Sequence, residues 1–295
     1  MAINVYYAKL NNMGDLLNEY IIPEVTGEKV IECPNAIKFD VMGIGSYGAA
    51  IWANREKTLS AISKDLIKKT YGKFVTKPCA VWGTGFFEDY SNCSLQLVRK
   101  NVSFIAVRGA LSQRIIEQSL GRDINPVLCD GGILSSKLIK DSIIKKYRVG
   151  FIPHYKEHDF CKENGLWRYF SENAERTIIN LREEPLDVIK RISECEFIVS
   201  SSLHGCIVAD SFGIPNVRVS ISNIPGTGFK FDDYYSGFGI NNPPIYIKNI
   251  TDIPKVTQIK DNYKITKSMV DKKKTAMEEC LRKYVAKYII NNRER

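Results

Sequence analysis

The chain has 295 residues, of which 44% are hydrophobic and 25% are charged, as is ordinary for a soluble globular protein. These proportions exclude a disordered chain, a collagen-like chain and a coiled coil. Lysine and arginine total 42 against 33 aspartates and glutamates, which gives a formal net charge of +9. An excess of this kind predicts an anionic partner: a nucleic acid, a membrane surface or a small anionic substrate.

The positive charge is concentrated at the C-terminus. Residues 264–295, the C-terminal tail, hold ten basic and four acidic residues, so the tail carries +6 and residues 1–263 carry +3. A solvated helix face and a surface that meets phosphates both account for such a run.

The sequence gives no sign of export or membrane insertion. The first residues lack a basic region followed by a long apolar run, so no signal peptide is predicted. No window approaches the roughly 18 apolar residues of a transmembrane helix. The eight cysteines are scattered without a Cys-x-x-Cys pair, and several lie in apolar runs. We therefore expect a reduced, cytoplasmic protein.

In the first half of the chain, short apolar runs alternate with amphipathic ones. The expected strands are Ile3–Tyr7, Ile37–Ile44, Cys79–Trp82 and Ser103–Val107. The expected helices are Leu16–Tyr20, Thr58–Lys69 and Leu111–Leu120. Alternation of strands and helices is typical of a parallel sheet.

The same alternation restarts after a mixed stretch at residues 135–146. The expected strands of the second half are Arg148–Ile152, Thr177–Leu181, Phe197–Ser200 and Val217–Val219. Helices are expected at Leu186–Glu194 and Gly205–Phe212. The pattern predicts two α/β domains, at residues 1–140 and 147–263, followed by the tail at 264–295.

The tail is expected to form one long amphipathic helix over residues 266–290. Apolar residues recur there at helical spacing, whereas lysines occupy the other faces. The apolar positions are Met277, Leu281, Val285, Tyr288 and Ile289. A helix in this place is expected to pack back across both halves.

The most informative stretch is residues 197–215, where a buried strand runs into three serines and then Leu203, His204 and Gly205. Small residues let a ligand approach the backbone, and a helix start offers free N–H groups and the positive end of its dipole. An anion is favoured at such a place, within reach of the His204 ring. A structural histidine beside a tight turn is the alternative, but the setting favours function.

Three further positions carry weaker signals. The glycine-rich stretch at residues 226–237 is expected to be a loop, either solvated or closing over an anion with Lys230 as a point charge. Asp15 either caps the helix that follows it or hydrogen-bonds a substrate hydroxyl. Arg108 ends a strand, as an anion ligand or as an exposed arginine.

Metal and dinucleotide sites are not favoured. His154 and His158 are four residues apart with Cys161 beyond, but Pro153 argues against a continuous helix through His154. The glycines at positions 43 and 45 lack a third glycine at the spacing of dinucleotide-binding folds. We therefore expect no bound metal.

Together these motifs resemble the polysaccharide pyruvyl transferase family, and the match covers most of the chain. Each motif is short, and the specificity lies in their order and spacing. The motifs are Asn12-Met13-Gly14-Asp15, Gly43-Ile44-Gly45-Ser46, Trp82-Gly83-Thr84-Gly85, Val107-Arg108-Gly109-Ala110-Leu111-Ser112, Cys129-Asp130, Ser202-Leu203-His204-Gly205, Ala209-x-x-x-Gly213-x-Pro215 and Lys230-Phe231-x-Asp233-Tyr234.

The resemblance implies a fold and a reaction. The fold is α/β and similar to GT-B glycosyltransferases, with two Rossmann-like domains, a cleft between them and, here, the long C-terminal helix. The reaction transfers a pyruvyl group from phosphoenolpyruvate to two hydroxyls of a sugar, forming a cyclic ketal during cell-surface polysaccharide synthesis. A galactose-type acceptor is expected. The co-substrate is phosphoenolpyruvate, and no other cofactor is implied.

The chemistry of this reaction gives residues of the chain expected roles. His204 and Asp15 would be catalytic, His204 moving a proton and Asp15 acting on the acceptor hydroxyl. The phosphoenolpyruvate site would be Arg108, Ser202, Leu203, His204, Gly205 and Lys230. The acceptor side would be Asn12, Asp15, Gly45, Ser46 and Gly85.

This chain departs from the family pattern at two of these motifs. Ser202 stands where the family often has an arginine before its Leu-His pair, which removes one guanidinium from the donor site. Of a Gly-Asp-Pro motif only Asp130 remains, and we assign it no role here.

Two rival functions stay open. A GT-B glycosyltransferase that uses a nucleotide sugar would have a similar fold and similar glycine turns. A non-enzymatic module for RNA or anionic lipid would use the basic tail but leaves the His204 turn unexplained, and the aromatic–basic interleaving of RNA readers is not seen. We expect no nucleic-acid partner. We expect the tail to face the inner surface of the cytoplasmic membrane, where a lipid-linked acceptor would wait.

Overall fold

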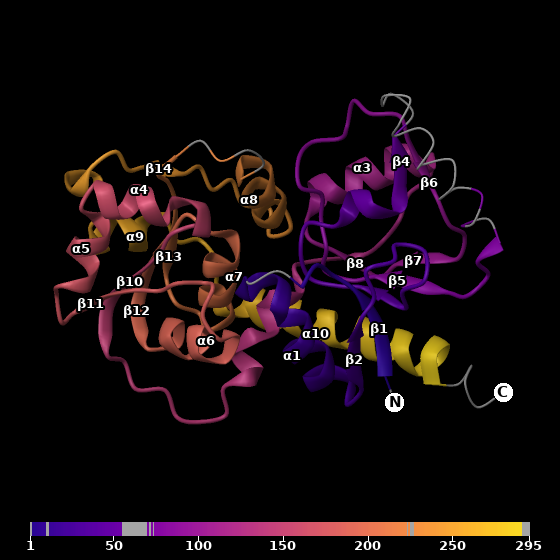
Figure 1. Cartoon of the computed structure of the whole chain (residues 1–295), viewed down its shortest axis with the longest axis horizontal. Coiled ribbons are helices and arrows are strands. Elements are labelled where there is room, and N and C mark those ends of the chain that lie inside the picture. The colour runs from indigo at the N-terminus through magenta and orange to yellow at the C-terminus, as the bar shows by residue number, and fades with distance from the viewer. Residues whose placement is uncertain are drawn as a thin grey trace.

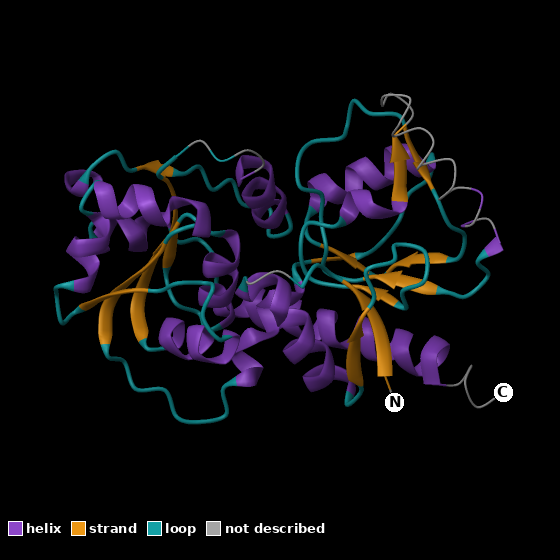
Figure 2. Ribbon diagram, in the orientation of Figure 1, coloured by secondary structure: helices purple, strands orange, loops and turns teal. Residues whose placement is uncertain are grey.

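The computed structural model describes residues 2–9, 12–54, 70, 72, 74–222, 224 and 227–290. Within these residues the chain forms a mixed α/β fold in which two five-stranded parallel sheets lie side by side with helices between them (Figures 1 and 2). The helix expected at residues 58–69 lies outside the described residues.

The first sheet comes from the N-terminal part of the chain. Its strands are β1 (Ala2–Tyr6), β2 (Lys29–Glu32), β3 (Val41–Met42), β5 (Cys79–Val81) and β7 (Val102–Phe104), in the order β2-β1-β3-β5-β7. All four pairings are parallel. The inner strands β3 and β5 are buried throughout, as expected of a parallel sheet covered on both faces. β3 is shorter than the strand expected at residues 37–44, because residues 36–38 form a turn.

The second sheet has the same number of strands and is also parallel. Its strands are β10 (Tyr147–Ile152), β11 (Arg176–Ile178), β12 (Cys195–Ser200), β13 (Asn216–Ser220) and β14 (Ile245–Tyr246), in the order β11-β10-β12-β13-β14. The four strands expected in this half are found here, each shifted by three residues or fewer at either end.

Two small sheets complete the strands of the described residues. β4 (Trp52–Asn54) pairs antiparallel with β6 (Leu95–Leu97), and β8 (Ala106–Val107) pairs parallel with β9 (Val127–Leu128). The single strand expected at residues 103–107 was therefore wrong. It divides at Ile105, whose N–H still bonds the Val81 carbonyl of the first sheet while its own carbonyl accepts from Val127.

Helices surround both sheets. The α-helices are α1 (Met13–Thr26), α3 (Ala110–Leu120), α4 (His158–Glu163), α5 (Leu166–Ser171), α6 (Pro185–Ser193), α7 (Leu203–Ser211), α8 (Thr227–Ser236), α9 (Val256–Asn262) and α10 (Lys267–Val285). The 3₁₀ helices are η1 (Gly48–Ile51), η2 (Gly131–Leu138), η3 (Tyr155–Glu157) and η4 (Ile250–Asp252), and η5 (Ala286–Ile290) is a π-helix that continues α10. Among the helices of the described residues, none is long and apolar enough to cross a membrane.

The prediction of a loop at residues 226–237 was also wrong, because α8 forms there. Its apolar side chains Phe231, Tyr234 and Tyr235 stand three and four residues apart and are 3% exposed or less. Burial of that face outweighs the flexibility that Gly228 introduces.

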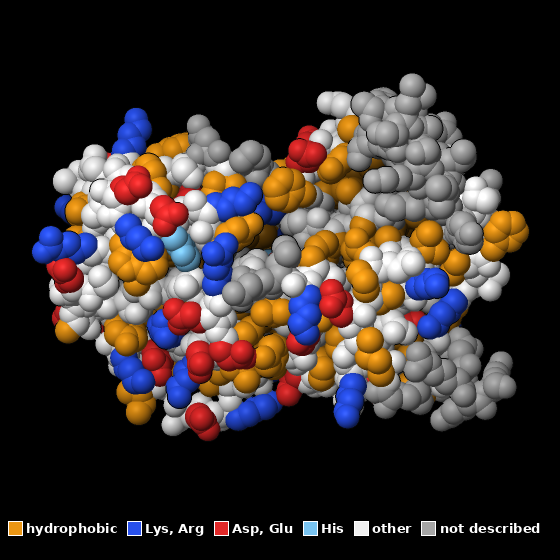
Figure 3. Space-filling view, in the orientation of Figure 1, with side chains coloured by type: hydrophobic (Ala, Val, Ile, Leu, Met, Phe, Trp, Pro, Cys, Tyr) orange, Lys and Arg blue, Asp and Glu red, His pale blue; other side chains and the backbone are white. Residues whose placement is uncertain are grey.

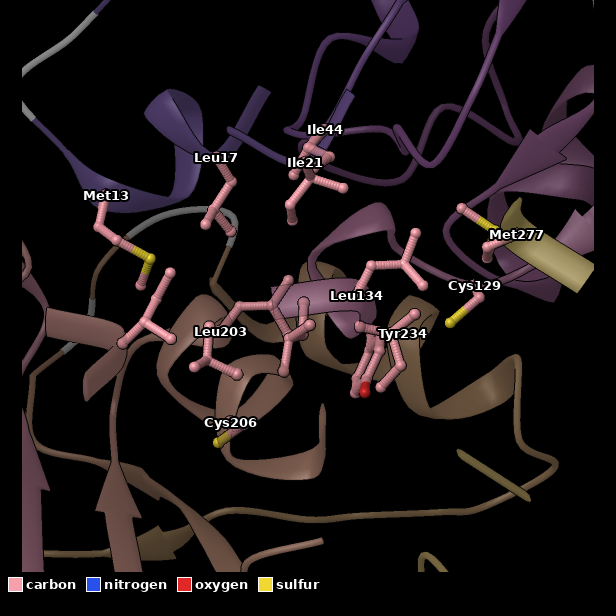
Figure 4. Close-up of a cluster of buried hydrophobic side chains, with 14 of the residues drawn as sticks. Met13, Leu17, Ile21, Ile44, Cys129, Leu134, Leu203, Cys206, Tyr234 and Met277 are labelled. Atoms are coloured by element: carbon pink, nitrogen blue, oxygen red, sulfur yellow. The ribbon is translucent and has the colours of Figure 1, made fainter. Parts of the chain in front are cut away.

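One continuous core joins the two sheets. Figure 4 shows side chains from α1, η2, α7, α8 and α10 meeting there, including Leu17, Leu134, Leu203, Tyr234 and Met277. The same cluster includes Val5 of the first sheet and Ile198 of the second.

The tail helix α10 packs against both halves, as expected from its sequence. Met277, Leu281 and Val285 are 2% exposed or less. Trp82 near the first sheet donates its indole N–H to the Met277 carbonyl at 3.0 Å. Lys274 donates to the carbonyl of Ser211 at the end of α7, which belongs to the second half, at 2.6 Å.

Candidate functional site

A cavity of about 510 Å³ lies between the two sheets. Its lining comes from both halves of the chain: Asn12, Asp15, Gly45, Ser46, Tyr47 and Phe87 on one side, and His154, Tyr155, Lys156, Arg182, Ser202, Leu203, His204, Ile224 and Lys230 on the other. In Figure 3, Lys and Arg side chains lie on the left-hand lobe beside the notch that separates it from the right-hand lobe.

The cavity lies where strands of both sheets end. Gly45 to Tyr47 follow β3, His154 to Lys156 follow β10, and Ser202 to His204 follow β12. Ligands of open parallel sheets bind beyond the carboxyl ends of the strands. The fold therefore brings three strand-to-helix turns to one cavity.

The start of α7 faces this cavity. Ser202 is its N-cap, with extended backbone and no hydrogen bond from its side chain to the helix. The first N–H groups of a helix have no partner within the helix, and the helix dipole makes this end positive. Gly205 is buried behind the turn, where a Cβ would lie 2.5 Å from Ser200 Oγ. A small residue is therefore required for the helix to leave the strand so tightly.

His204 lies at the bottom of the cavity, its side chain 14% exposed. Its ring lies against α1, since a Cβ on Gly14 would be 2.0 Å from Nδ1. Its Nε2 lies 4.0 Å from Oδ2 of Asp130, which is fully buried. Burial lowers the pKa of His204 to about 3, and the charges of Lys230 and Arg108 add to this effect. The free protein therefore holds a neutral imidazole there.

Lys230 reaches the cavity from α8. Its Nζ lies 5.0 Å from the centre of the Phe87 ring. Burial lowers its pKa to about 8, helped by the charge of Arg108 and opposed by that of Asp15. At neutral pH most Lys230 side chains are therefore still charged, and they face the cavity without an ion pair within the described part of the chain.

Arg108, expected as a donor ligand or as an exposed arginine, is only 1% exposed and lies behind the residues that line the cavity. Its Nε bonds Asp233 of α8 at 3.0 Å, and another nitrogen donates to the Phe86 carbonyl. Its Nη1 donates to Ser46 Oγ at 2.9 Å, and Ser46 does line the cavity. Arg108 thus touches the site through Ser46 while its charge is balanced by Asp233.

Asp15 does not cap α1, because the helix begins at Met13 with Asn12 as its N-cap. One carboxylate oxygen accepts from the Tyr47 hydroxyl, and the other accepts from Asn12 Nδ2 at 3.1 Å. Burial raises the pKa of Asp15, and these two hydrogen bonds oppose that rise. The carboxylate is held at the cavity wall.

The acceptor-side residues proposed from sequence come together with one exception. Asn12, Asp15, Gly45 and Ser46 all line the cavity. Gly85 lies behind the wall instead, where a Cβ would meet the Arg108 guanidinium at 2.7 Å. The absence of a side chain at Gly85 leaves room for that guanidinium.

The sequence analysis did not predict the rim of the cavity, where the cations Lys156 and Arg182 lie beside the ring of Tyr155. The Arg182 guanidinium lies 4.9 Å from the centre of the Tyr155 ring, and Lys156 Nζ lies 5.9 Å from it. All three follow the ends of β10 and β11. The rule that ligands meet carboxyl strand ends would have found them.

His154 and His158, whose spacing is similar to that of metal ligands, lie apart in the structure. His154 lines the cavity, and burial lowers its pKa to about 4. The ring of His158 instead packs edge-on against Trp167, with ring centres 5.3 Å apart. Within the described residues, no group of three or more His, Cys, Asp or Glu side chains is placed to hold a metal ion.

Comparison with known proteins agrees with the motifs. A family model described as polysaccharide pyruvyl transferase matches residues 40–223, more than half of the chain. The chain is 34% identical over 100 residues to the succinoglycan biosynthesis protein ExoV of Rhizobium meliloti (strain 1021), a match that covers 34% of this chain and 30% of that protein. It is 38% identical over 242 residues to an uncharacterised protein of Acanthamoeba polyphaga mimivirus, covering 80% of this chain and 74% of that one. The chain belongs to the polysaccharide pyruvyl transferase family.

Proposed function

We propose that the protein transfers a pyruvyl group from phosphoenolpyruvate to two hydroxyls of a sugar, with a galactose-type residue as acceptor, during cell-surface polysaccharide synthesis. One observation carries the proposal: the cavity places His204, Lys230 and the N-terminus of α7 together, with the Asp15 carboxylate on the same cavity. This arrangement supplies a cationic end for an anionic donor and a base for a hydroxyl.

Phosphoenolpyruvate carries a phosphate and a carboxylate on adjacent atoms. Its binding needs cations and oriented N–H groups in a site that excludes water. Lys230 and the first N–H groups of α7 supply these at the bottom of the cavity, and Lys156 and Arg182 add charge at the rim. This positive charge at the rim supports the proposal, because Ser202 stands where members of the family often have an arginine.

The reaction is proposed to begin with a proton moving from His204 to the methylene carbon of the donor. The resulting oxocarbenium-like centre is attacked by an acceptor hydroxyl, whose proton passes to Asp15. The C–O bond to phosphate then breaks, and a second hydroxyl closes the ketal and gives its proton to the departing phosphate. These steps need an acid, a base and charge neutralisation, so we propose no cofactor beyond the co-substrate phosphoenolpyruvate.

The acceptor is proposed to lie between Asp15 and the aromatic side chains of the cavity. Phe87 and Tyr155 line it from opposite halves, and their rings offer apolar faces to a sugar. Asn12 and Ser46 provide polar groups beside Asp15.

The overall arrangement is proposed to be GT-B-like, with Rossmann-like domains at residues 1–140 and 147–263. The paired parallel sheets and the cavity at their strand ends support this assignment. We also propose that the protein works at the inner face of the cytoplasmic membrane on a lipid-linked acceptor. Lys267, Lys272 and Lys287 of the tail are exposed and would meet anionic lipid.

Ligand-induced thermal stabilisation tests the donor directly. Phosphoenolpyruvate should raise the melting temperature of the wild type and of His158→Ala, whose ring is outside the cavity. It should raise it much less in Lys230→Met. Stabilisation by a nucleotide sugar and none by phosphoenolpyruvate would instead identify a GT-B glycosyltransferase.

A further inference from the structure

Two buried polar atoms face each other beneath the cavity without a hydrogen bond. They are His204 Nε2 and Asp130 Oδ2, which lie 4.0 Å apart. Neither has a hydrogen-bond partner in the part of the chain that the structure describes. The other oxygen of Asp130 accepts from the N–H of Gly132 at 2.8 Å, and this bond fixes the carboxyl at the start of η2.

An unpaired polar atom in a protein interior costs about 1–3 kcal/mol, so two such atoms in contact range need an explanation. A closure of about 1 Å would bring this pair to hydrogen-bond distance. Catalytic hydrogen bonds are often long in the absence of substrate and shorten when it binds. The pair has the geometry of such an open hydrogen bond.

The surroundings of His204 make an anionic partner necessary if the ring is to carry a proton. Lys230 of α8 and Arg108 after β8 both oppose a positive imidazole. Asp15 of α1 is committed to Tyr47 and Asn12, and Asp233 is committed to Arg108 and Ser112. Asp130 is the carboxyl whose free oxygen faces the ring.

We propose that Asp130 is a positioning residue that holds His204 in one tautomer and stabilises it as an imidazolium, an inference that rests on the proposed role of His204 as proton donor. The Nε2–H bonds to Asp130, so Nδ1 is the nitrogen that serves the donor. Gly14 lies against the Nδ1 edge of the ring, and because a Cβ there would stand 2.0 Å from Nδ1, a glycine is needed for the donor to reach this nitrogen.

The proton balance follows from this pairing. When the anionic donor binds, the pair takes up one proton from solvent, which resides on Nδ1 while Asp130 is ionised. In the transfer step the Nδ1–H bond breaks and a C–H bond forms at the methylene carbon of phosphoenolpyruvate. The electron pair of the broken bond stays on the ring, which returns to its neutral form.

The fully buried Asp210 of α7 provides a matched control for Asp130. Burial raises the pKa of both carboxyls to about 7. Asp210, however, accepts from Asn216 Nδ2 at 2.6 Å and from the Tyr234 hydroxyl at 2.8 Å, and it does not line the cavity. Asp130→Asn and Asp210→Asn therefore remove the same charge from two buried places.

The first measurement is nitrogen-15 NMR of the wild type, in which the chain's three histidines give few signals to assign. His204 should appear as the Nε2–H tautomer and should lose that preference in Asp130→Asn but keep it in Asp210→Asn. A wild-type His204 in the Nδ1–H tautomer would overturn the proposal, even if Asp130→Asn failed to fold.

The second measurement is calorimetry of phosphoenolpyruvate binding in buffers of different ionisation enthalpy, together with kinetics. Proton uptake should be larger in the wild type and in Asp210→Asn than in Asp130→Asn, by at most one proton. The kcat of Asp130→Asn should fall about 10²–10⁴-fold, because a positioned proton donor typically accelerates a reaction by that factor. Unchanged proton uptake and kcat in Asp130→Asn would refute the positioning role while leaving the proposed function intact. Absence of phosphoenolpyruvate binding in the wild type, with the tautomer still dependent on Asp130, would refute the proposed function instead.

Discussion

Lys230 and Arg108 carry the same charge, but the fold uses them differently. Arg108 is 1% exposed and its charge is balanced by Asp233, so it stiffens the cavity wall through Ser46. Lys230 faces the cavity and is the cation of this pair that a ligand can meet. The sequence places both near strand or helix ends, and only the packing separates the two roles.

The pH dependence of donor binding is expected to report on Lys230. Its pKa is near 8, so its charge is present below this value and is lost as the pH rises through it. The kcat/KM for phosphoenolpyruvate should therefore fall above about pH 8. Arginine stays charged at any such pH, so Lys230→Arg should move this fall to higher pH. Initial rates between pH 6 and about pH 10 measure it, and an alkaline fall at the same pH in both proteins would contradict the assignment.

The histidine and serine positions of the site could be predicted from sequence because they lie in one local stretch. The strand, the turn and the helix around His204 are contiguous, so their spacing alone indicates an anion site. Tyr47 could not be recognised in this way, and Arg182 could be recognised only by the rule that ligands meet the carboxyl ends of strands. Their importance depends on contacts with Asp15 and Tyr155, which lie far away in sequence.

Helix α8 links the two halves of the molecule. Its Asp233 accepts from the Ser112 N–H at 2.8 Å and the Ser112 hydroxyl at 2.6 Å at the start of α3, besides pairing with Arg108. Its Tyr234 donates to Asp210 of α7 at 2.8 Å. These contacts explain the spacing of Lys230-Phe231-x-Asp233-Tyr234. Lys230 faces the cavity, whereas Asp233 and Tyr234 hold α8 against its neighbours.

Replacement of Asp233 by asparagine is expected to lower stability strongly. The change leaves the Arg108 guanidinium buried without its counter-charge, and breaking a buried pair in this way costs about 3–5 kcal/mol. Glu172→Gln is the control, because Arg168 and Glu172 are 76% and 61% exposed and their pair should contribute little to stability. Urea unfolding followed by circular dichroism compares them. Equal losses in the two variants would show that Asp233 does not clamp α8.

Element types followed from the local pattern in β12 and α7, where all residues but one are buried. The predictions failed where residues that are distant in sequence determine the backbone conformation. The chain at residues 102–107 divides between two sheets because β8 meets β9, and α8 forms because a distant surface buries its aromatic face. Neither partner is visible in the local sequence.

At the scale of the whole molecule, the basic tail has a structural role besides the membrane contact that we propose for it. Its apolar face completes the core shared by both sheets through Met277 and Leu281. Several of its cations are used internally, since Lys274 bonds Ser136 and the Ser211 carbonyl and Arg282 bonds the Val25 carbonyl. Removal of the tail would therefore unfold the protein rather than merely release it from a surface.

Surface charge must for this reason be tested by substitution. The triple change of Lys267, Lys272 and Lys287 to glutamine should leave the melting temperature within a few degrees of wild type, because all three side chains are exposed. Binding to vesicles that contain anionic lipid should weaken markedly, at about 1 kcal/mol per lysine near the surface. Co-sedimentation with such vesicles at physiological salt measures it. Equal binding by both proteins would exclude this face as the membrane contact.

The central claim is that the cavity around His204 carries out pyruvyl transfer, and turnover tests it most directly. The protein is incubated with phosphoenolpyruvate and a panel of galactosides while released phosphate and the mass of the sugar are followed. We predict one phosphate for each ketal formed, dependence on the acceptor, and loss of both signals in a folded His204→Ala variant. Full activity in His204→Ala, or glycosyl transfer from a nucleotide sugar with no product from phosphoenolpyruvate, would contradict the account.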